Sequence, residues 1–282
     1  MGDSSLDSVL RGALAWPVDS VSAAVVGLGG RILGTLGNQA PAYRLASVTK
    51  PLTAYAALLA VEEGALTLDT PAGPAGATVR HLLAHASGLP LEGPAPIAAP
   101  GSRRIYSNRG FEVLADVVEA AVEMPFAEYL RDGVLTPLGM AGTALHGSAA
   151  RACVGTSADL ARFAAELLEP VLLHPTTAEA YATVQFPELR GMVPGFGKQD
   201  PNPWGLGVEV RGHKSPHWTG AAQSPATFGH FGQSGTFLWV DRAAGVACVC
   251  LTDRAFDVWA AQAWPSFNDA VLAEAVRLMG SP

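Results

Sequence analysis

A serine and a lysine three residues apart are the feature of this chain best suited to chemistry. Lys50 follows Ser47 in the segment SVTK, and it is the only charged residue between Arg44 and Glu62. A lysine buried in apolar surroundings tends to lose its proton, whereas an arginine cannot, because its pKa stays above about 12. A neutral amine beside a hydroxyl is a base next to a nucleophile. The alternative for this tetrapeptide is a helix-capping serine followed by a solvated lysine.

A helix that starts at this serine would place both side chains on one face. Pro51 lacks an N–H and is tolerated in a first helical turn, where backbone N–H groups have no intrahelical partner. We therefore expect a helix from near Ser47 to about Gly64. Residues spaced i and i+3 on a helix have Cβ atoms about 5–6 Å apart. The N-terminal end of the helix dipole would also stabilise negative charge that develops at the serine.

Composition restricts the possible function classes. The chain has 282 residues, of which 49% are hydrophobic and 15% charged, with a net charge of −7. These values are typical of a globular protein with one large core or two lobes, and the acidic balance argues against nucleic acid or an anionic membrane as partner. No apolar run has the length of a membrane span, and no signal-peptide pattern opens the chain, so we expect a cytoplasmic protein. The three cysteines lack zinc-like spacing, and the proposed chemistry needs no metal or organic cofactor.

Hydrophobic patterns divide the chain into strand-rich ends and a helical middle. The ends are predicted to form helices at 4–15 and about 265–279, and strands at 22–27, 31–36, 206–211, 226–231, 236–241 and 245–251. The middle is predicted to form helices at 79–86, 109–123, 126–131 and 159–168. This order predicts an α+β fold, an antiparallel sheet flanked by N- and C-terminal helices with an inserted all-α lobe. We expect one domain, 1–282, with an α/β lobe at about 1–64 and 205–282, a helical lobe at about 65–204, and the active site in the cleft between them.

Two later segments carry further polar groups suited to catalysis. Tyr106 and Asn108 stand directly before a predicted helix, and the run GHFGQSGT at 229–236 lies on a late strand. With the Ser-x-x-Lys pair, the chain resembles the serine β-lactamase and penicillin-binding-protein superfamily. The resemblance is closest to its class C-like branch, which includes family VIII esterases, D-aminopeptidases, D-alanyl-D-alanine carboxypeptidases and class C lactamases. It continues in order from about residue 20 to 255, through the segments HLLAHASGLP at 81–90 and PGSRRIYSNRG at 100–110.

The resemblance implies a role for each of these residues. Ser47 would be the nucleophile that accepts an acyl group, and Lys50 would be its base. Tyr106 would share their proton network and relay the proton to the leaving group. Asn108 would hold Lys50 in place and bind the acyl side of the substrate. The backbone N–H groups of Ser47 and Gln233 would form the oxyanion hole.

The third motif, the triplet at 230–232, differs from the lactamase pattern, and the differences affect which substrate the site would select. His230 stands where lactamases usually carry a lysine, in the triplet that ends at Gly232, and a histidine is mostly neutral at pH 7. Phe231 replaces a threonine or serine whose hydroxyl could contact a substrate carboxylate. These differences favour an esterase, or a D-amino-acid amidase or peptidase, that acts on small acyl substrates through an acyl-enzyme.

Two other functions stay open. A class C-like β-lactamase or penicillin-binding activity would use the same residues on a lactam. A non-catalytic binding or sensor module could keep the fold without turnover, although the presence of Ser47, Lys50 and Tyr106 together argues against it. The partner in the enzyme interpretations is a small-molecule ester, amide or lactam, and the sequence leaves the oligomeric state open.

Three more residues have two interpretations each. His81 and His85 have the i, i+4 spacing of a metal-binding pair, but Leu82 replaces the glutamate of the His-Glu-x-x-His motif. A structural role near Ser87 is therefore favoured for these histidines. Trp204 could either line the acyl pocket or fill the core.

Overall fold

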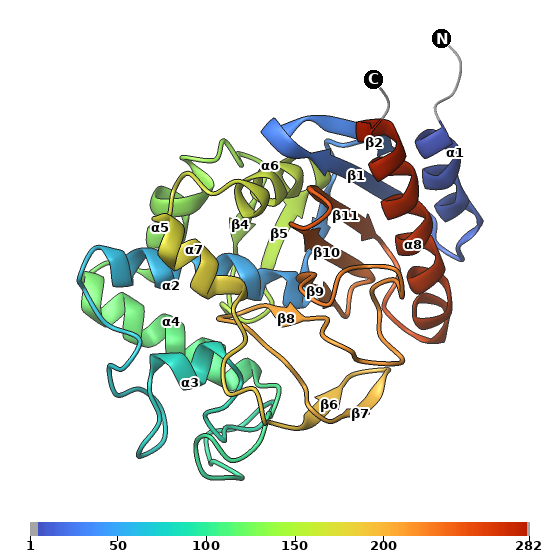
Figure 1. Ribbon diagram of the computed structural model, residues 1–282. Coiled ribbons are helices and arrows are strands. Elements are labelled where there is room, and N and C mark those ends of the chain that lie inside the picture. The colour runs from blue at the N-terminus through green and yellow to red at the C-terminus, as the bar shows by residue number, and fades with distance from the viewer. Residues whose placement is uncertain (1–4, 281–282) are drawn as a thin grey trace.

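A six-stranded antiparallel sheet, in the order β2-β1-β11-β10-β9-β8, forms the centre of the protein (Figure 1). The structure is a computed structural model that describes residues 5–280. The strands are β1 (Val21–Gly27), β2 (Ile32–Leu36), β8 (Glu209–Val210), β9 (Phe228–Gly232), β10 (Thr236–Asp241) and β11 (Val246–Thr252). Because β1 pairs with β11, the two ends of the chain build one sheet, as the strand-rich ends predicted.

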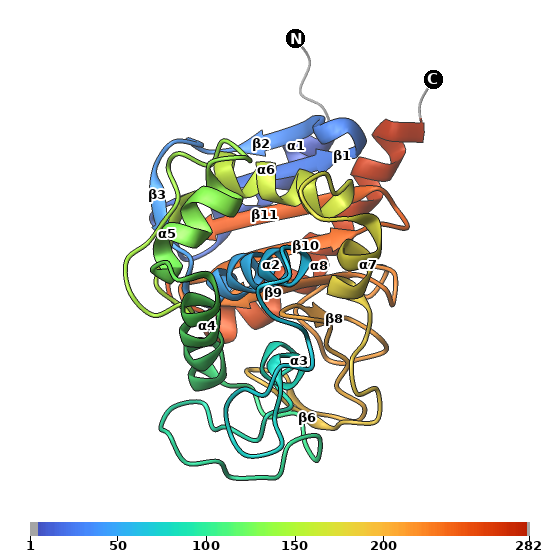
Figure 2. The ribbon, with the colours of Figure 1, turned by 90° about the vertical axis from the view of Figure 1, so that its left-hand side faces the viewer.

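Helices cover both faces of this sheet (Figures 1 and 2). On one face, α1 (Ser5–Arg11) packs beside α8 (Val258–Gly280), and on the other α6 (Ser157–Leu168) packs against β1, β10 and β11. Successive side chains of a strand point to opposite faces. Accordingly Ala24 and Val26 of β1 belong to the core under α6, whereas Ala23 and Val25 belong to the core under α1 and α8. Because both faces of the sheet are buried, the strand sequences are continuous apolar runs and do not alternate between apolar and polar residues.

The remaining helices contribute side chains to the core on the face that α6 covers, and short turns and strands connect the elements. The helices are α2 (Thr49–Glu62), α3 (Val79–Leu83), α4 (Asn108–Val122), α5 (Phe126–Leu130) and α7 (Pro175–Ala182), with short turns η1 (Gly12–Ala15), η2 (Leu28–Gly30), η3 (Ala46–Val48) and η4 (Arg131–Leu135). A second sheet contains β3 (Ala42–Arg44), β4 (Ala144–Leu145) and β5 (Cys153–Thr156), and a hairpin contains β6 (Gly191–Val193) and β7 (Gly197–Gln199). Among residues 5–280, none of the helices combines the length and hydrophobicity that a membrane span requires.

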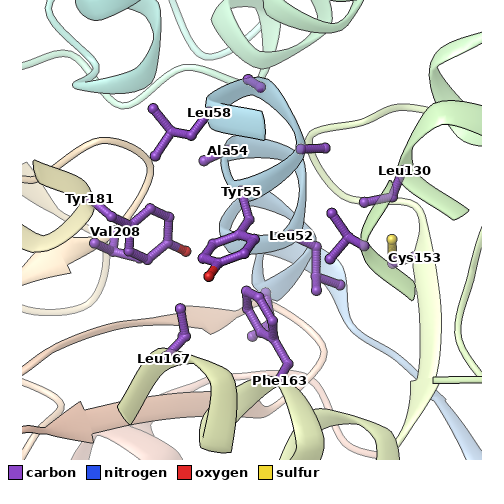
Figure 3. Packing of buried hydrophobic residues seen from close by; sticks show 14 of the residues in the cluster. Leu52, Ala54, Tyr55, Leu58, Leu130, Cys153, Phe163, Leu167, Tyr181 and Val208 are labelled. Carbon is purple, nitrogen blue, oxygen red and sulfur yellow. The ribbon is translucent and has the colours of Figure 1, made fainter. Parts of the chain in front are cut away.

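Helix α2 is buried on nearly all sides (Figure 3). Its central residue Tyr55 is 1% exposed and donates a hydrogen bond of 2.5 Å to Glu166 Oε1 of α6. The side chains packed around it come from α5, α6, α7, β5 and the segment before β8, and include Leu130, Phe163, Leu167, Tyr181, Cys153 and Val208. Lys50, in the first turn of the same helix, is fully buried, and its Nζ lies near the rings of Tyr106 and Phe111.

Most predicted elements are found near their predicted positions. The helix predicted from Ser47 to Gly64 is present as η3 followed by α2, with Pro51 in the first helical turn. The strands predicted at 22–27 and 31–36 are β1 and β2, which pair antiparallel, and the strand predicted at 236–241 is β10. The helix predicted at 4–15 is α1 followed by η1, except for residue 4, which lies outside the described residues.

Three elements differ from their predicted bounds by more than two residues. The strand expected at 206–211 is reduced to β8, because Gly207 has a φ of 95° and lies against Ala54 of α2. The helix expected at 79–86 ends at Leu83, because His85 adopts a left-handed φ of 54°. The final helix begins at Val258 instead of about 265.

Tertiary packing explains the longer final helix. Ala260 and Trp264 are both fully buried before Pro265, so contacts with the sheet layer stabilise helix on both sides of the proline. A proline has no N–H to donate to the carbonyl four residues earlier, here that of Ala261, so its position suggested the start of a helix. In the structure the helix continues through Pro265, so the proline does not mark the start. Although α6 falls inside the range predicted for the helical lobe, it packs on the sheet. The division into two lobes stays a prediction.

Candidate active site

Ser47 lies in the tight turn η3, between β3 and α2. The preceding Ala46 has a φ of 45°, a left-handed conformation that costs an L-residue about 1–2 kcal/mol. The turn is closed by the Val48 N–H, which donates to the Leu45 carbonyl at 3.1 Å. The same carbonyl accepts a hydrogen bond of 3.0 Å from the Thr236 hydroxyl of β10. The turn that carries the nucleophile is therefore fixed to the β9–β10 connection.

Gly232, the last residue of β9, approaches this turn so closely that no side chain fits. A Cβ at Gly232 would lie 2.4 Å from the Leu45 carbonyl oxygen and 2.6 Å from Thr236 Oγ1. We expect Gly232→Ala to push the strand and the turn apart, to destabilise the protein by about 1–3 kcal/mol, and to reduce ester turnover. Denaturant unfolding and turnover of p-nitrophenyl acetate would measure both effects. Gly12→Ala is the matched control, because nothing lies within 4 Å of its Cβ position; equal stability and turnover in the two variants would contradict the prediction.

The Lys50 amine is enclosed beneath Ser47. The side chain is 0% exposed, and Nζ lies 3.3 Å from Ser47 Oγ. Nζ also donates to Asn108 Oδ1 at 2.7 Å and to the Ala150 carbonyl at 3.0 Å, and it lies 4.5 Å from the centre of the Tyr106 ring. The structure thus brings together four of the residues that the motifs indicated.

Burial lowers the pKa of Lys50 well below its ordinary value. The Arg151 guanidinium lowers this pKa further, whereas the carboxylates of Glu92 and Glu112 act in the opposite direction. None of these carboxylates forms an ion pair with Nζ among residues 5–280. Burial thus favours the neutral amine over the ammonium, and a neutral amine can accept a proton.

Tyr106 and His230 close the opposite side of the site. The Tyr106 hydroxyl lies 3.3 Å from His230 Nε2, and His230 Nδ1 lies 2.6 Å from the Phe231 carbonyl oxygen. A carbonyl oxygen only accepts, so Nδ1 carries the ring proton and Nε2 accepts from the Tyr106 hydroxyl. Burial lowers the pKa of His230 to about 3, which leaves the ring neutral at pH 7.

The Tyr106 phenol also stays neutral. Burial raises the pKa of Tyr106 above its ordinary value, and a hydrogen bond with Ser47 offsets this only in part. At neutral pH the residue is a phenol that can pass a proton on, and a phenolate base is not formed.

A cavity of about 30 Å³ opens at the serine. Its walls are mostly apolar, and they are made by Ser47, Tyr106, Val193, Pro194, Trp204, Glu209, His230, Phe231 and Gln233. Trp204 is 3% exposed and contacts the rings of Tyr106 and His230, so the structure places it at the cavity wall. Among residues 5–280, neither the Ser47 nor the Gln233 backbone N–H has a hydrogen-bond partner. Two unpaired donors therefore lie at this cavity.

A larger groove adjoins the cavity. Its volume is about 770 Å³, and it shares Gln233 with the cavity. Strand β3, the segment 151–154 and the start of the segment after β11 form most of its lining. Gln233 therefore borders both a small apolar cavity and a wide groove.

His85 supports Tyr106 from behind. Its Nδ1 accepts a hydrogen bond of 3.1 Å from the Ser107 N–H, and its ring lies 4.6 Å from the Tyr106 ring. His81, one helical turn earlier, instead hydrogen-bonds Thr78 Oγ1 at 2.9 Å. The two rings thus have separate partners, and within residues 5–280 no group of three His, Cys, Asp or Glu residues is arranged to hold a metal ion.

Two carboxylates at the site were missed by the motif analysis. Glu92 accepts a hydrogen bond of 2.8 Å from Asn108 Nδ2, and Glu209 lines the cavity while paired with Lys214 at 2.7 Å. The sequence does contain a signal for Glu209, because it is the single charged residue in the apolar run LGVEV. Glu92 had none, because it lies in a Pro- and Gly-rich loop with no regular pattern.

Comparisons with known proteins identify related chains. The family model described as Beta-lactamase matches residues 20–272. The solved structure of a beta-lactamase from Mycobacterium bovis is 52% identical, with a TM-score of 0.94, over 95% of this chain and 99% of that chain. The esterase EstB from Burkholderia gladioli is 28% identical over 88% of this chain and 86% of the esterase. Penicillin-binding protein 4* from Bacillus subtilis is 30% identical over 37% of this chain, which spans only 30% of that relative.

Proposed function

The chain belongs to the Beta-lactamase family of serine hydrolases, and on that premise we propose that it hydrolyses small esters or D-amino-acid amides through an acyl-enzyme on Ser47. The observation that carries the proposal is the buried Lys50 amine, 3.3 Å from the Ser47 hydroxyl.

The partners of Lys50 support its role as base. A neutral amine has two N–H groups and one lone pair. The Asn108 Oδ1 and Ala150 carbonyl oxygens accept the two N–H groups, at 2.7 and 3.0 Å. The direction that remains, toward Ser47 Oγ, is that of the lone pair. The Ser47 hydroxyl would donate to Lys50 and give up its proton as Oγ attacks the substrate carbonyl carbon.

Tyr106 would carry the proton to the leaving group. Its hydroxyl donates to the neutral His230 ring, and its oxygen lies beside Ser47. As the alkoxide or amine departs, Tyr106 would donate its own proton and recover one from Lys50. Water would then attack the acyl-enzyme with the same groups working in the reverse direction.

The unpaired N–H groups of Ser47 and Gln233 would bind the oxyanion. Each such donor contributes about 3–4 kcal/mol to stabilisation of the tetrahedral intermediate. Both residues line the cavity at the nucleophile, which supports their pairing in this role. The groove beside Gln233 offers room for the larger part of a substrate.

The neutral His230 and the apolar cavity wall favour substrates without a carboxylate. A lactam antibiotic carries a carboxylate that requires a charged or hydroxyl partner, and a hydrogen bond to a charged group contributes about 1.5–3 kcal/mol. His230 has no charge at pH 7, and its neighbour Phe231 offers no hydroxyl. The relative named as an esterase, aligned over most of both chains, agrees with this preference. The 52% identical relative described as a beta-lactamase favours lactam hydrolysis as the second candidate.

We expect p-nitrophenyl acetate or butyrate to be hydrolysed with a kcat/KM at least about tenfold above that for nitrocefin, since a lost charge-assisted contact corresponds to roughly a factor of ten or more. A panel that also contains D-amino-acid p-nitroanilides would rank the substrate classes. Efficient nitrocefin hydrolysis with negligible ester turnover would overturn the ester assignment in favour of the lactamase.

Covalent labelling tests the acyl-enzyme itself. A fluorophosphonate is expected to label the protein and Ser102→Ala, and to leave Ser47→Ala unlabelled. Ser102 is an exposed serine that hydrogen-bonds Ala99 and does not line the cavity, which makes it a matched control. Absence of both labelling and ester turnover would refute a hydrolase, and acylation without release of the acyl group would indicate a sensor module.

A further inference from the structure

We propose that Glu92 is a positioning residue that fixes the orientation of the Asn108 amide and thereby directs the lone pair of Lys50 toward Ser47. The inference rests on the proposed function, because it concerns the base of that reaction. It assigns a role to a loop residue that belongs to none of the three motifs.

The loop between α3 and α4 carries Glu92 to the site. The Leu91 carbonyl accepts hydrogen bonds from the Asn108 N–H at 3.0 Å and the Arg109 N–H at 3.2 Å, which fastens the loop to the start of α4. The next side chain, Glu92, accepts from Asn108 Nδ2 at 2.8 Å and also from Arg151 Nη1. The carboxylate is thus held in place from two sides.

The chemistry of Glu92 determines which end of the amide faces Lys50. A carboxylate only accepts hydrogen bonds, so the NH₂ end of Asn108 must face Glu92 and the oxygen must face Lys50. In the flipped amide, the NH₂ end would face the amine and take its lone pair. An N–H of Lys50 would then point toward Ser47, and the residue would be a donor to the nucleophile instead of an acceptor.

Glu92 remains an acceptor at neutral pH. The hydrogen bond from Asn108 and the interaction with Arg151 keep the pKa of Glu92 below its ordinary value. The Glu92 carboxylate is about half exposed, so solvent screens the effect of its charge on Lys50. Its hydrogen bond to Asn108 is a direct contact and is not weakened in this way. Orientation of the amide is therefore the effect that this contact can exert most strongly.

The loop between β4 and β5 completes the arrangement. It supplies the Ala150 carbonyl, which accepts the second N–H of Lys50, and the neighbouring Arg151, which pairs with Glu92. Two loops that are distant in sequence therefore meet around one amine. Together they leave it a single free direction, toward Ser47.

A double-mutant cycle tests the inference. Glu92→Ala is expected to lower kcat for p-nitrophenyl acetate by about tenfold to a hundredfold, with KM changed by less than about threefold, because side chains in one hydrogen-bond network are energetically coupled. In an Asn108→Ala background, the same substitution should add less than about twofold. Glu92→Gln keeps a side-chain oxygen for Asn108 Nδ2 and should stay within about threefold of the parent protein.

Glu112→Ala serves as the charge control. Glu112 also acts on Lys50 electrostatically, but its carboxylate accepts from Ser148, whereas the Asn108 amide donates to Glu92. We expect its kcat to stay within about threefold of the parent. Denaturant unfolding of each variant separates a loss of stability from a loss of kcat.

Three results would overturn the inference. They are an unchanged kcat in Glu92→Ala, the same fold-loss in the Asn108→Ala background, and a loss in Glu92→Gln as large as that in Glu92→Ala. The second would show that Glu92 acts on the loop and not through Asn108, and the third would show that its charge is what acts. Ester turnover that survives Ser47→Ala would instead refute the proposed function, while turnover that requires Ser47 but not Glu92 refutes only this inference.

Discussion

Lys50→Arg is expected to reduce kcat/KM for p-nitrophenyl esters as thoroughly as Lys50→Ala, by about 10²–10⁴-fold, the usual contribution of a general base. An arginine keeps its charge at every pH at which the protein is folded, so it has no lone pair for Ser47. The larger guanidinium would also be a buried cation near the exposed Arg151, whose charge already lowers the pKa of Lys50.

Two further variants keep this prediction testable. Lys50→Met is uncharged and of similar length, so it should fold without a buried charge and be equally inactive. Lys198→Arg changes an exposed lysine and should leave turnover unaltered. Steady-state kinetics and unfolding curves of all four variants provide the measurement. More than about a tenth of the parent kcat/KM in the arginine variant would remove the lysine from the role of base.

Glu209→Gln is expected to destabilise the protein by about 3–5 kcal/mol, the cost of leaving one member of a buried ion pair without its partner. Glu209 is 2% exposed, and its two oxygens accept from Lys214 Nζ and Trp218 Nε1, both at 2.7 Å. The glutamine preserves the shape and an acceptor for Trp218. It leaves the Lys214 ammonium, which also donates to the carbonyls of Pro203 and Val210, without a counter-charge.

The pH dependence of this loss follows from the pKa shifts. Burial alone would raise the pKa of Glu209, but Lys214 and His217 outweigh it and hold the pKa below its ordinary value. A carboxylate with a lowered folded-state pKa stabilises the fold above its unfolded-state pKa, about 4.3, and loses this contribution as pH falls. The difference in unfolding free energy between the parent and Glu209→Gln should therefore be full at pH 7 and shrink below about pH 4.

A second substitution should rescue the first. Lys214→Met, added to Glu209→Gln, removes the unpaired charge, and replacement of a whole buried pair is often neutral. We expect the double variant to regain most of the lost stability in urea unfolding. Additive losses from the two substitutions would show that the pair is not the source of the effect.

The nucleophile region was predictable from sequence because its determinants are local. The i, i+3 spacing of Ser47 and Lys50, with Pro51 next to them, specifies one helical turn and the face that both side chains share. The predicted start of the helix agrees with η3 and α2 to within about a turn. Strand β10 was equally predictable, since glycines bound an unbroken run of β-forming residues.

The parts that the sequence did not reveal depend on contacts between distant segments. The second N–H of Lys50 goes to the Ala150 carbonyl, 100 residues away, and a backbone oxygen has no signature in the sequence. Glu92 acquires its position from loop contacts that no local pattern encodes. Strands β3 to β5 contain two to four residues each, too few for a period-2 pattern, and they form because their neighbours hold them in place.

The central claim, that Lys50 is a neutral base, is tested most directly by ¹³C NMR of protein labelled at lysine Cε. The chain has three lysines, so three signals are expected, and Lys50→Met and Lys198→Arg assign them. We predict that the Lys50 signal at pH 7 has the chemical shift of an uncharged amine and does not change up to pH 9. A Lys50 signal with the chemical shift of an ammonium at pH 7 would contradict the account.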